Sequence, residues 1–443
     1  MDKVNKSNKM GVVQLTILTA VNMMGSGIIM LPTKLAEVGT MSVLSWLVTA
    51  LGSLALAFAF SKCGLISSRA GGMGGYAEYA FGKSGNFMAN YTYSISLLIA
   101  NIAIAISAVG YGSDLFDVVL SPMGVCLATI AVLWITTVCN FGGAKITGRI
   151  GSVTVWGVIL PVLGLSLFGW FWFSPSLYVD SWNPHQMNFF SAVSTSISMT
   201  LWAFLGLESA CANADAVENP QKNVPIAVFG GTLACAIVYI LSTNVIAGII
   251  PNEALLKSTA PFGLAFAHIF TPEVGKIVMG LMTLACVGSL LGWQFTVAQV
   301  FKSSSDIGYF PRVFSKVTKA GAPVVGMLIL GGVQTLLALM TISPSLTKQF
   351  NSLVDLAVVT NLIPYVLSMA ALIPMQRYIN LTNGQIKFNT VIAVIGSIYS
   401  FYALYASGST AMLMGALVTF AGWTFYGMCI KDENTVPTLK TNN

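Results

Sequence analysis

Runs of about 20 apolar residues recur along this chain from end to end. A helix of that length spans the hydrocarbon core of a bilayer, and it pairs its own backbone polar groups, as that environment requires. Only 8% of the 443 residues are charged and 55% are hydrophobic, whereas a soluble domain carries about 25% charged residues. The sequence therefore predicts an all-α integral membrane protein with many transmembrane helices.

The apolar runs divide the chain into twelve predicted spans. The first run has no small-residue cleavage site, so we expect it to be retained as a span and not removed as a signal peptide. The predicted spans, with ends good to a few residues, are 11–32, 41–62, 87–112, 122–140, 150–173, 190–211, 224–249, 275–301, 323–341, 351–373, 389–406 and 409–430.

The distribution of basic residues predicts the orientation. If the N-terminus is cytoplasmic, 17 of the 21 Lys and Arg residues fall in cytoplasmic segments, and the other four are Lys34, Lys257, Lys276 and Lys348. Cytoplasmic loops of membrane proteins carry an excess of basic residues. Both termini are therefore predicted to be cytoplasmic, and the net charge of +6 needs no nucleic-acid partner.

Glu208 is the only carboxylate well inside any of these apolar runs. An ionisable group at membrane depth costs at least a few kcal/mol, so it usually faces a cavity and has a function there. The alternative is a glutamate in a buried hydrogen-bond network that binds no ligand. Asp355, near the outer end of its span, is expected at the rim and not in a site.

Glycines interrupt two of the spans. Gly25-Ser26-Gly27 lies midway in the first span and Gly206 midway in the sixth. Interrupted helices at matching places in two halves are typical of inverted-repeat transporters, whose site lies near the membrane midplane. For the first motif alone, a close helix crossing is an equally good explanation. Together they predict a five-plus-five inverted repeat with discontinuous helices 1 and 6.

This architecture divides the chain into segments. They are a cytoplasmic N-terminus (1–10), a first inverted repeat (11–173), a second inverted repeat (190–373), two further spans (389–430) and a cytoplasmic tail (431–443).

A site between two broken helices would offer complementary groups. Free amides at a half-helix N-terminus favour a carboxylate, and free carbonyls at a half-helix C-terminus favour an ammonium group. Glu208 would take a further cation, and Trp293, which lies far from either end of its span, offers a ring to a desolvated cation. These groups predict cationic amino acids or diamines as substrates. Glu208 could also relay protons.

Other functional classes are not supported. The chain has no catalytic triad, nucleotide motif or metal-ligand cluster, so we expect no enzyme activity, no cofactor and no metal. Its 7 cysteines include no C-x-x-C pair, and we predict no disulfide. A non-transporting membrane sensor would need an output domain, and only about a dozen residues follow the last span.

Three motifs resemble the basic amino acid/polyamine antiporters of the amino acid–polyamine–organocation superfamily. They are Gly25-Ser26-Gly27-Ile28-Ile29-Met30-Leu31-Pro32, Leu201-Trp202-Ala203-Phe204-Leu205-Gly206-Leu207-Glu208-Ser209 and Val217-Glu218-Asn219-Pro220-Gln221-Lys222-Asn223-Val224-Pro225. The resemblance implies the leucine-transporter-like fold, a bacterial inner membrane and a homodimer. It implies exchange of putrescine for ornithine, with proton-coupled putrescine uptake as a second mode and lysine–cadaverine exchange as the alternative.

The resemblance also implies roles at the amino-acid end of the substrate. Asn22, Ser26 and Gly27 would hold the α-carboxylate. The backbone around Trp202 and Leu205 would take the α-ammonium group.

Further roles implied by the resemblance concern the rest of the substrate. Trp293 would stack on its aliphatic and cationic part, and Asn101 would contact its distal end. Glu208 would pair with an amine or sense protons. Tyr426, a weaker match, would be an aromatic residue near the polyamine path.

Three residues resemble gates: Tyr93, Tyr365 and, on the outer side, Trp202. The chain departs from arginine–agmatine exchangers at Leu97 and Ala357, where hydrogen-bonding groups that face a guanidinium would be expected. These apolar residues favour an ammonium substrate over arginine.

Overall fold

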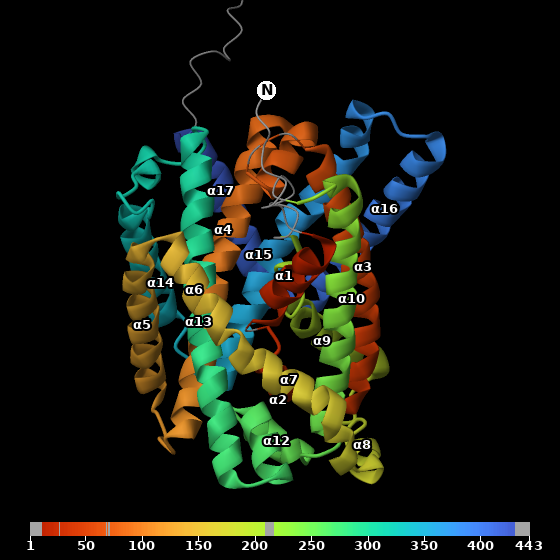
Figure 1. Cartoon of the computed structure of the whole chain (residues 1–443), viewed down its shortest axis with the longest axis vertical. Coiled ribbons are helices and arrows are strands. Elements are labelled where there is room, and N and C mark those ends of the chain that lie inside the picture. Colours follow the sequence, from red (N-terminus) through yellow and green to blue (C-terminus); the bar gives the residue numbers. More distant parts are fainter. Residues whose placement is uncertain (1–10, 26, 68, 70, 209–216, 430–443) are drawn as a thin grey trace, which may run out of the picture.

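The computed structural model describes residues 11–25, 27–67, 69, 71–208 and 217–429. Within these ranges every element of regular secondary structure is a helix, which confirms the all-α prediction. The helices pack side by side in an upright bundle, and α4 (Met73–Leu115) begins at its upper end in Figure 1. We call this upper end the N-terminal end of the molecule. The helices α2 (Leu31–Leu35), α8 (Pro175–Asp180) and α12 (Pro261–Ile269) lie toward the opposite end.

The helices are, in order, α1 (Val12–Met24), α2 (Leu31–Leu35), α3 (Val43–Ile66), α4 (Met73–Leu115), α5 (Pro122–Cys139), α6 (Ala144–Thr154), α7 (Trp156–Phe168), α8 (Pro175–Asp180), α9 (Phe189–Trp202), α10 (Pro220–Ala247), α11 (Asn252–Lys257), α12 (Pro261–Ile269), α13 (Pro272–Asp306), α14 (Val324–Met340), α15 (Leu346–Met375), α16 (Asn383–Ala406) and α17 (Ser409–Cys429).

Nine helices of the described part are long and apolar enough to cross a bilayer, and α1 and α14 are shorter apolar helices. The predicted spans 11–32 and 190–211 correspond to α1 and α9, and both helices end partway along the predicted range. The count of twelve spans therefore stays a prediction.

The first and sixth predicted spans are interrupted where glycine occurs. The α1 helix ends at Met24, a turn follows from Gly25, and α2 begins at Leu31. Pro32 lies in the first turn of α2, where the fixed φ of proline suits a helix start. The α9 helix ends at Trp202, and Gly206 beyond it has a φ of +106°. Glycine adopts this backbone conformation without steric cost.

The connections contain more helix than the hydropathy pattern predicts. Residues 73–82 of the glycine-rich segment 71–82 form the first turns of α4, which bends at Gly82 (φ 64°). The span predicted at 150–173 begins earlier, as α6 and α7. The short helices α8, α11 and α12 occupy segments that we expected to be loops.

The α4 helix lies at the centre of the bundle. In its apolar stretch 89% of the residues are buried, against 11% in α17. It packs against α13 and α15, and α1 packs against α10. A central helix contributes residues to any interior cavity, so α4 determines much of the site described below.

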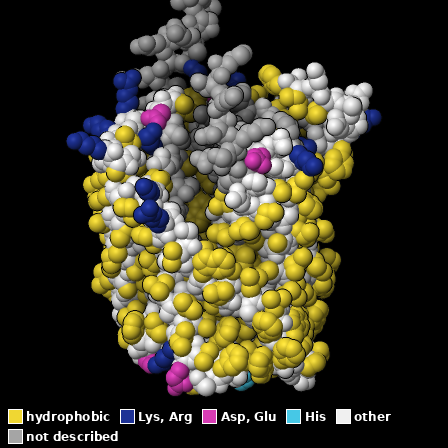
Figure 2. All heavy atoms as spheres, viewed as in Figure 1, with side chains coloured by type: hydrophobic (Ala, Val, Ile, Leu, Met, Phe, Trp, Pro, Cys, Tyr) yellow, Lys and Arg dark blue, Asp and Glu magenta, His cyan; other side chains and the backbone are white. Residues whose placement is uncertain are grey.

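Charged and apolar side chains are separated on the surface. Figure 2 shows Lys and Arg gathered toward the N-terminal end, above a broad hydrophobic surface. Exposed apolar side chains on the outer helices, such as Leu51, Phe190 and Met340, suit contact with lipid. This pattern fits a membrane protein whose N-terminal end carries the basic loops.

Candidate functional site

The Glu208 carboxylate is buried and accepts three hydrogen bonds. The hydroxyl of Tyr93 on α4 donates to Oε1 at 3.0 Å, and the hydroxyl of Tyr365 on α15 donates to Oε2 at 2.5 Å. The backbone N–H of Gly206 donates to Oε2 at 3.1 Å. An ionised carboxylate only accepts hydrogen bonds, so this form of Glu208 suits the three donors around it. Helices α4 and α15 therefore meet the interrupted segment after α9 at this one side chain.

The two helix breaks lie against each other. A Cβ atom on Gly27 would lie 3.0 Å from the Cα atom of Ala203, and one on Gly206 would lie 3.3 Å from the carbonyl oxygen of Asn22. Only glycine allows backbones to approach this closely. The turn after α1 and the turn after α9 therefore form one region of irregular backbone in the interior, where the predicted site lies.

A cavity of about 40 Å³ opens beside Glu208, with room for about three water molecules. It lies between α1, α4, the end of α9, α13 and α15. Its lining residues are Asn22, Met23, Gly27, Tyr93, Ser96, Leu97, Ala100, Ile104, Trp202, Leu205, Gly206, Glu208, Trp293 and Asn361. Among the described residues, Glu208 is the only charged side chain in that lining. The cavity thus combines one acid with aromatic and aliphatic walls.

One face of α4 forms the apolar wall. Tyr93, Leu97, Ala100 and Ile104 line the cavity at the three- and four-residue spacing that places side chains on one face of a helix. Asn101 lies next to Ala100 on the same helix. It is fully buried, although it is not part of the lining.

Three side chains at or next to this cavity have buried polar atoms with no hydrogen-bond partner among the described residues. They are the amide of Asn101, at both its oxygen and its nitrogen, the indole Nε1 of Trp202 and the amide nitrogen of Asn361. Buried polar groups are nearly always paired, and exceptions usually mark an unseen water or ligand. The region around the cavity therefore has unused hydrogen-bonding capacity.

A second and larger cavity, about 330 Å³, lies between α1, α6 and α13. Asn22 and Trp293 line both cavities, so they form the partition between them. The other walls of the larger cavity include Thr147 and Gly151 of α6. Figure 2 shows the face of the molecule hollowed between the positions of α6 and α10 in Figure 1. No charged side chain lines this cavity in the described part of the chain.

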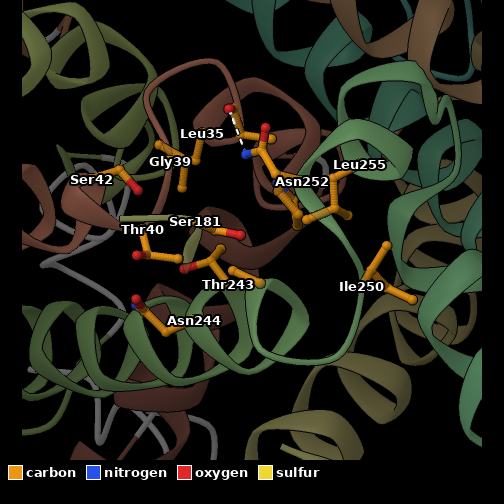
Figure 3. A pocket seen from close by; sticks show the side chains of 13 residues that line it. Leu35, Gly39, Thr40, Ser42, Ser181, Thr243, Asn244, Ile250, Asn252 and Leu255 are labelled. Atoms are coloured by element: carbon orange, nitrogen blue, oxygen red, sulfur yellow. Dashed lines mark hydrogen bonds between the residues drawn. The ribbon is translucent and has the colours of Figure 1, made fainter. Parts of the chain in front are cut away.

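A third cavity lies between α2, α10 and α11 (Figure 3). Thr40, Thr243, Asn244 and Asn252 supply its polar walls, and the amide of Asn252 donates to the carbonyl of Ala36 at 2.8 Å. None of the described residues that line it is charged. A cation would find no counter-charge there, so the cavity beside Glu208 is the better candidate site.

The structure brings most of the residues assigned by sequence to one place. Seven of them line the cavity beside Glu208, counting Glu208 itself: Asn22, Gly27, Tyr93, Trp202, Leu205, Glu208 and Trp293. Tyr365 contacts the site through its hydrogen bond to Glu208. Ser26 lies outside the described residues. The functional roles of all these residues stay predictions.

Two residues of the sequence argument lie elsewhere. Tyr426 packs against Phe87 with ring centroids 5.3 Å apart, in a cluster that also contains Phe310. It does not line the cavity. Leu97 lines the cavity but Ala357 does not, and the carbonyl of Ala357 accepts a hydrogen bond from Ser96 at 2.8 Å. The argument against a guanidinium substrate therefore rests on Leu97.

Five lining residues of the described part were not singled out from the sequence: Met23, Ser96, Ala100, Ile104 and Asn361. Asn361 has a usable signal, because an amide inside an apolar span is uncommon. The other four have none, since small polar and apolar residues occur throughout buried helices.

Replacing Gly206 with alanine is expected to destabilise the protein by about 1–3 kcal/mol, the cost of a strained backbone conformation. The new Cβ would lie 3.2 Å from the Trp293 ring at a φ of +106°. Thermal unfolding of purified protein in detergent measures the effect. Gly292→Ala on α13 is the matched control, because its Cβ would meet nothing within 4 Å. Equal melting temperatures for the two variants would contradict the proposed strain.

Comparison with known proteins agrees with this architecture. The chain is 72% identical over 423 residues to putrescine transporter PotE of Escherichia coli (strain K12), covering 96% of each chain. It is 69% identical over 422 residues to putrescine transporter PotE of Haemophilus influenzae, covering 95% of this chain and 97% of the relative. A cadaverine/lysine antiporter of Escherichia coli (strain K12) is 31% identical over 439 residues, with 97% of each chain covered.

The match to a protein family extends over nearly the whole chain. Residues 10–430 match the family described as amino acid permease. This range includes both interrupted helices and every residue that lines the cavity beside Glu208. The protein is therefore a polytopic membrane transporter of the amino acid permease family.

Proposed function

We propose that this protein exchanges putrescine for ornithine across a bacterial inner membrane. The single observation that supports this most is the Glu208 carboxylate beside a cavity between two interrupted helices. The 72% identity to a putrescine transporter supports the choice of substrate. A permease that carried neutral amino acids would have no need for a lone buried acid, which is costly at membrane depth.

The lining residues suggest how a diamine would bind. One ammonium group would pair with Glu208. Its methylenes would lie against Leu97, Ala100 and Ile104, and the ring of Trp293 would contribute cation–π attraction. For ornithine, the α-carboxylate would meet the free amides of the broken helix near Gly27. The distal amine would reach Asn101, whose amide is unpaired among the described residues.

Alternating access is the proposed mechanism of exchange. The larger cavity beside α6 would lead from the cytoplasm toward Trp293 and Asn22, which separate it from the binding cavity. Trp202 would close the outer side; its ring lies edge-on to that of Phe350, with the ring centroids 6.5 Å apart. When substrate binds, the hydroxyls of Tyr93 and Tyr365 would give up their hydrogen bonds to the Glu208 carboxylate. Interrupted helices at a midplane site are the usual basis of such rocking motions.

The exchange would be sensitive to membrane potential. Ornithine carries one net positive charge at neutral pH and putrescine carries two. Each cycle would then move one net charge, worth about 2.3 kcal/mol per 100 mV. We also propose that Glu208 can bind a proton in place of the second amine, which would allow putrescine uptake with a proton. We also propose that both termini are cytoplasmic and that the protein forms a homodimer.

The alternative is exchange of lysine for cadaverine, each one methylene longer. The 31% identity to a cadaverine/lysine antiporter keeps this alternative open. A pocket distinguishes one methylene by about 1–3 kcal/mol.

Counterflow in proteoliposomes decides between the two. With labelled ornithine inside, external putrescine should drive efflux at least about tenfold more efficiently than cadaverine, by kcat/KM. Empty liposomes are the control for leakage. Equal or faster exchange with cadaverine would favour the alternative, and no exchange with any amine would refute the proposed substrates.

A further inference from the structure

A group of charged residues lies beyond Trp202, at the end of the molecule opposite the N-terminal end. Lys34 of α2 pairs with Glu37 at 2.8 Å between Nζ and Oε2. The side-chain amide of Asn351 on α15 donates to Oε1 of Glu37 at 2.9 Å. The hydroxyl of Ser198 on α9 donates to Oδ1 of Asp355 on α15 at 2.8 Å. We call these five residues the outer charge cluster.

The outer charge cluster is built on the same helices as Trp202 and Phe350, whose two rings we call the aromatic lid. Ser198 is one turn before Trp202 on α9, and Asn351 directly follows Phe350, whose ring meets that of Trp202. In addition, α2 packs against α9, and α9 packs against α15. A movement that lifts Trp202 from Phe350 would therefore also separate residues of the cluster.

The cluster has an excess of negative charge. It holds two carboxylates, Glu37 and Asp355, and one cation, Lys34, and the charges of both Lys34 and Glu37 act on Asp355. The Lys34 side chain is only 12% exposed. Partly buried carboxylates are costly unless they are paired. With a single lysine shared between two acids, the cluster is short of one positive charge.

Asn351 provides an independent sign of a missing donor. Its side chain is 9% exposed, and its amide nitrogen already donates to Glu37. Its Oδ1 atom is buried and has no hydrogen-bond partner among the described residues. An acceptor left unpaired beside two carboxylates suits a ligand that brings several N–H donors and a positive charge. An ammonium group has both.

We propose that Asp355, Glu37 and Asn351 form an outer recognition site for the ammonium groups of the transported amine. Lys34 occupies this site while the lid is closed, and an incoming diamine replaces it when α2 and α15 separate. The site lies on the path to Glu208 and is reached before the Trp202 lid. This inference rests on the proposed function and on the predicted orientation, in which this end faces away from the cytoplasm.

The site would act on one side of the membrane only. Charge in a cleft concentrates counter-ions and raises association rates by about 10–10³-fold. Asp355→Asn should therefore raise the apparent KM for external putrescine about tenfold, the low end of that range. The KM for internal putrescine and the kcat should stay unchanged. Lys34→Gln should lower the external KM, because it removes the cation that competes with the substrate.

The experiment measures exchange of labelled putrescine in right-side-out and inside-out membrane vesicles. Asp117→Asn is the matched control: Asp117 is an exposed carboxylate paired with Lys276 at 2.5 Å, away from the cluster. Asp355→Glu keeps the charge and should show a smaller rise in the external KM than Asp355→Asn, which separates loss of charge from loss of folding.

The outcomes of this experiment are distinct. A rise in KM confined to right-side-out vesicles supports the outer recognition site. Equal changes in both orientations, or an unchanged external KM in Asp355→Asn, would overturn it and leave the proposed function standing. Wild-type vesicles that carry no putrescine in either orientation would refute the proposed function, and this inference with it.

Discussion

Glu208→Gln is expected to abolish putrescine transport, with kcat/KM at least about 100-fold below the wild type. Removing one partner of a buried ion pair costs about 3–5 kcal/mol, because the other charge is left uncompensated. In this protein the uncompensated charge would be the substrate's ammonium group. Transport of labelled putrescine by proteoliposomes measures the loss.

Folding should survive this substitution. Glutamine has nearly the size of glutamate, and its amide can still pair with the hydroxyls of Tyr93 and Tyr365, which donate to Glu208 in the wild type. Glu273→Gln, at an exposed position at the start of α13, is the matched control. Wild-type transport by Glu208→Gln would exclude the carboxylate as the binding group.

Trp293→Leu is expected to lower kcat/KM for putrescine about 30-fold, which corresponds to about 2 kcal/mol of lost cation–π attraction. The ring lies on the partition between the binding cavity and the larger cavity. Leucine keeps an apolar surface but offers no π face to a desolvated cation. The kcat/KM of Trp293→Phe should lie between those of the wild type and Trp293→Leu, since phenylalanine is a weaker partner for cations than tryptophan.

A second tryptophan provides the control for this substitution. Trp156 on α7 is 54% exposed on the outside of the bundle, so Trp156→Leu removes the same ring without touching either cavity. Initial rates over a range of putrescine concentrations separate KM from kcat. A loss shared equally by both variants would mean that the effect comes from destabilisation, and the cation–π contribution would be rejected.

The interruptions of the first and sixth spans could be predicted because their cause is local. Gly25 and Gly206 weaken a helix whatever surrounds them, and Glu208 is conspicuous because every neighbour within its run is uncharged. The ends of uninterrupted spans also have local causes, as in α5 and α17. Their bounds, Pro122–Cys139 and Ser409–Cys429, lie within one residue of the predictions.

The rest of the site depends on tertiary structure. Ser96 and Asn361 line the cavity because α4 and α15 turn the faces that carry them toward the interrupted segment after α9. The sequence of a single span does not show which of its faces points to the interior. Tyr426 shows the converse. An aromatic residue in an apolar run is equally compatible with a binding path and with packing against Phe87, and the structure places it in the packed cluster.

The short helices outside the spans were missed for a related reason. The α11 and α12 helices are too brief to show a clear period, and both begin next to a proline that reads as a loop signal.

Equilibrium binding of labelled putrescine to purified protein tests the central claim most directly. We predict one saturable site per chain in the wild type and in Glu273→Gln, and no saturable binding in Glu208→Gln at the same folded concentration. Undiminished binding by Glu208→Gln would contradict the claim that the cavity between the two broken helices is where the substrate's charge is held.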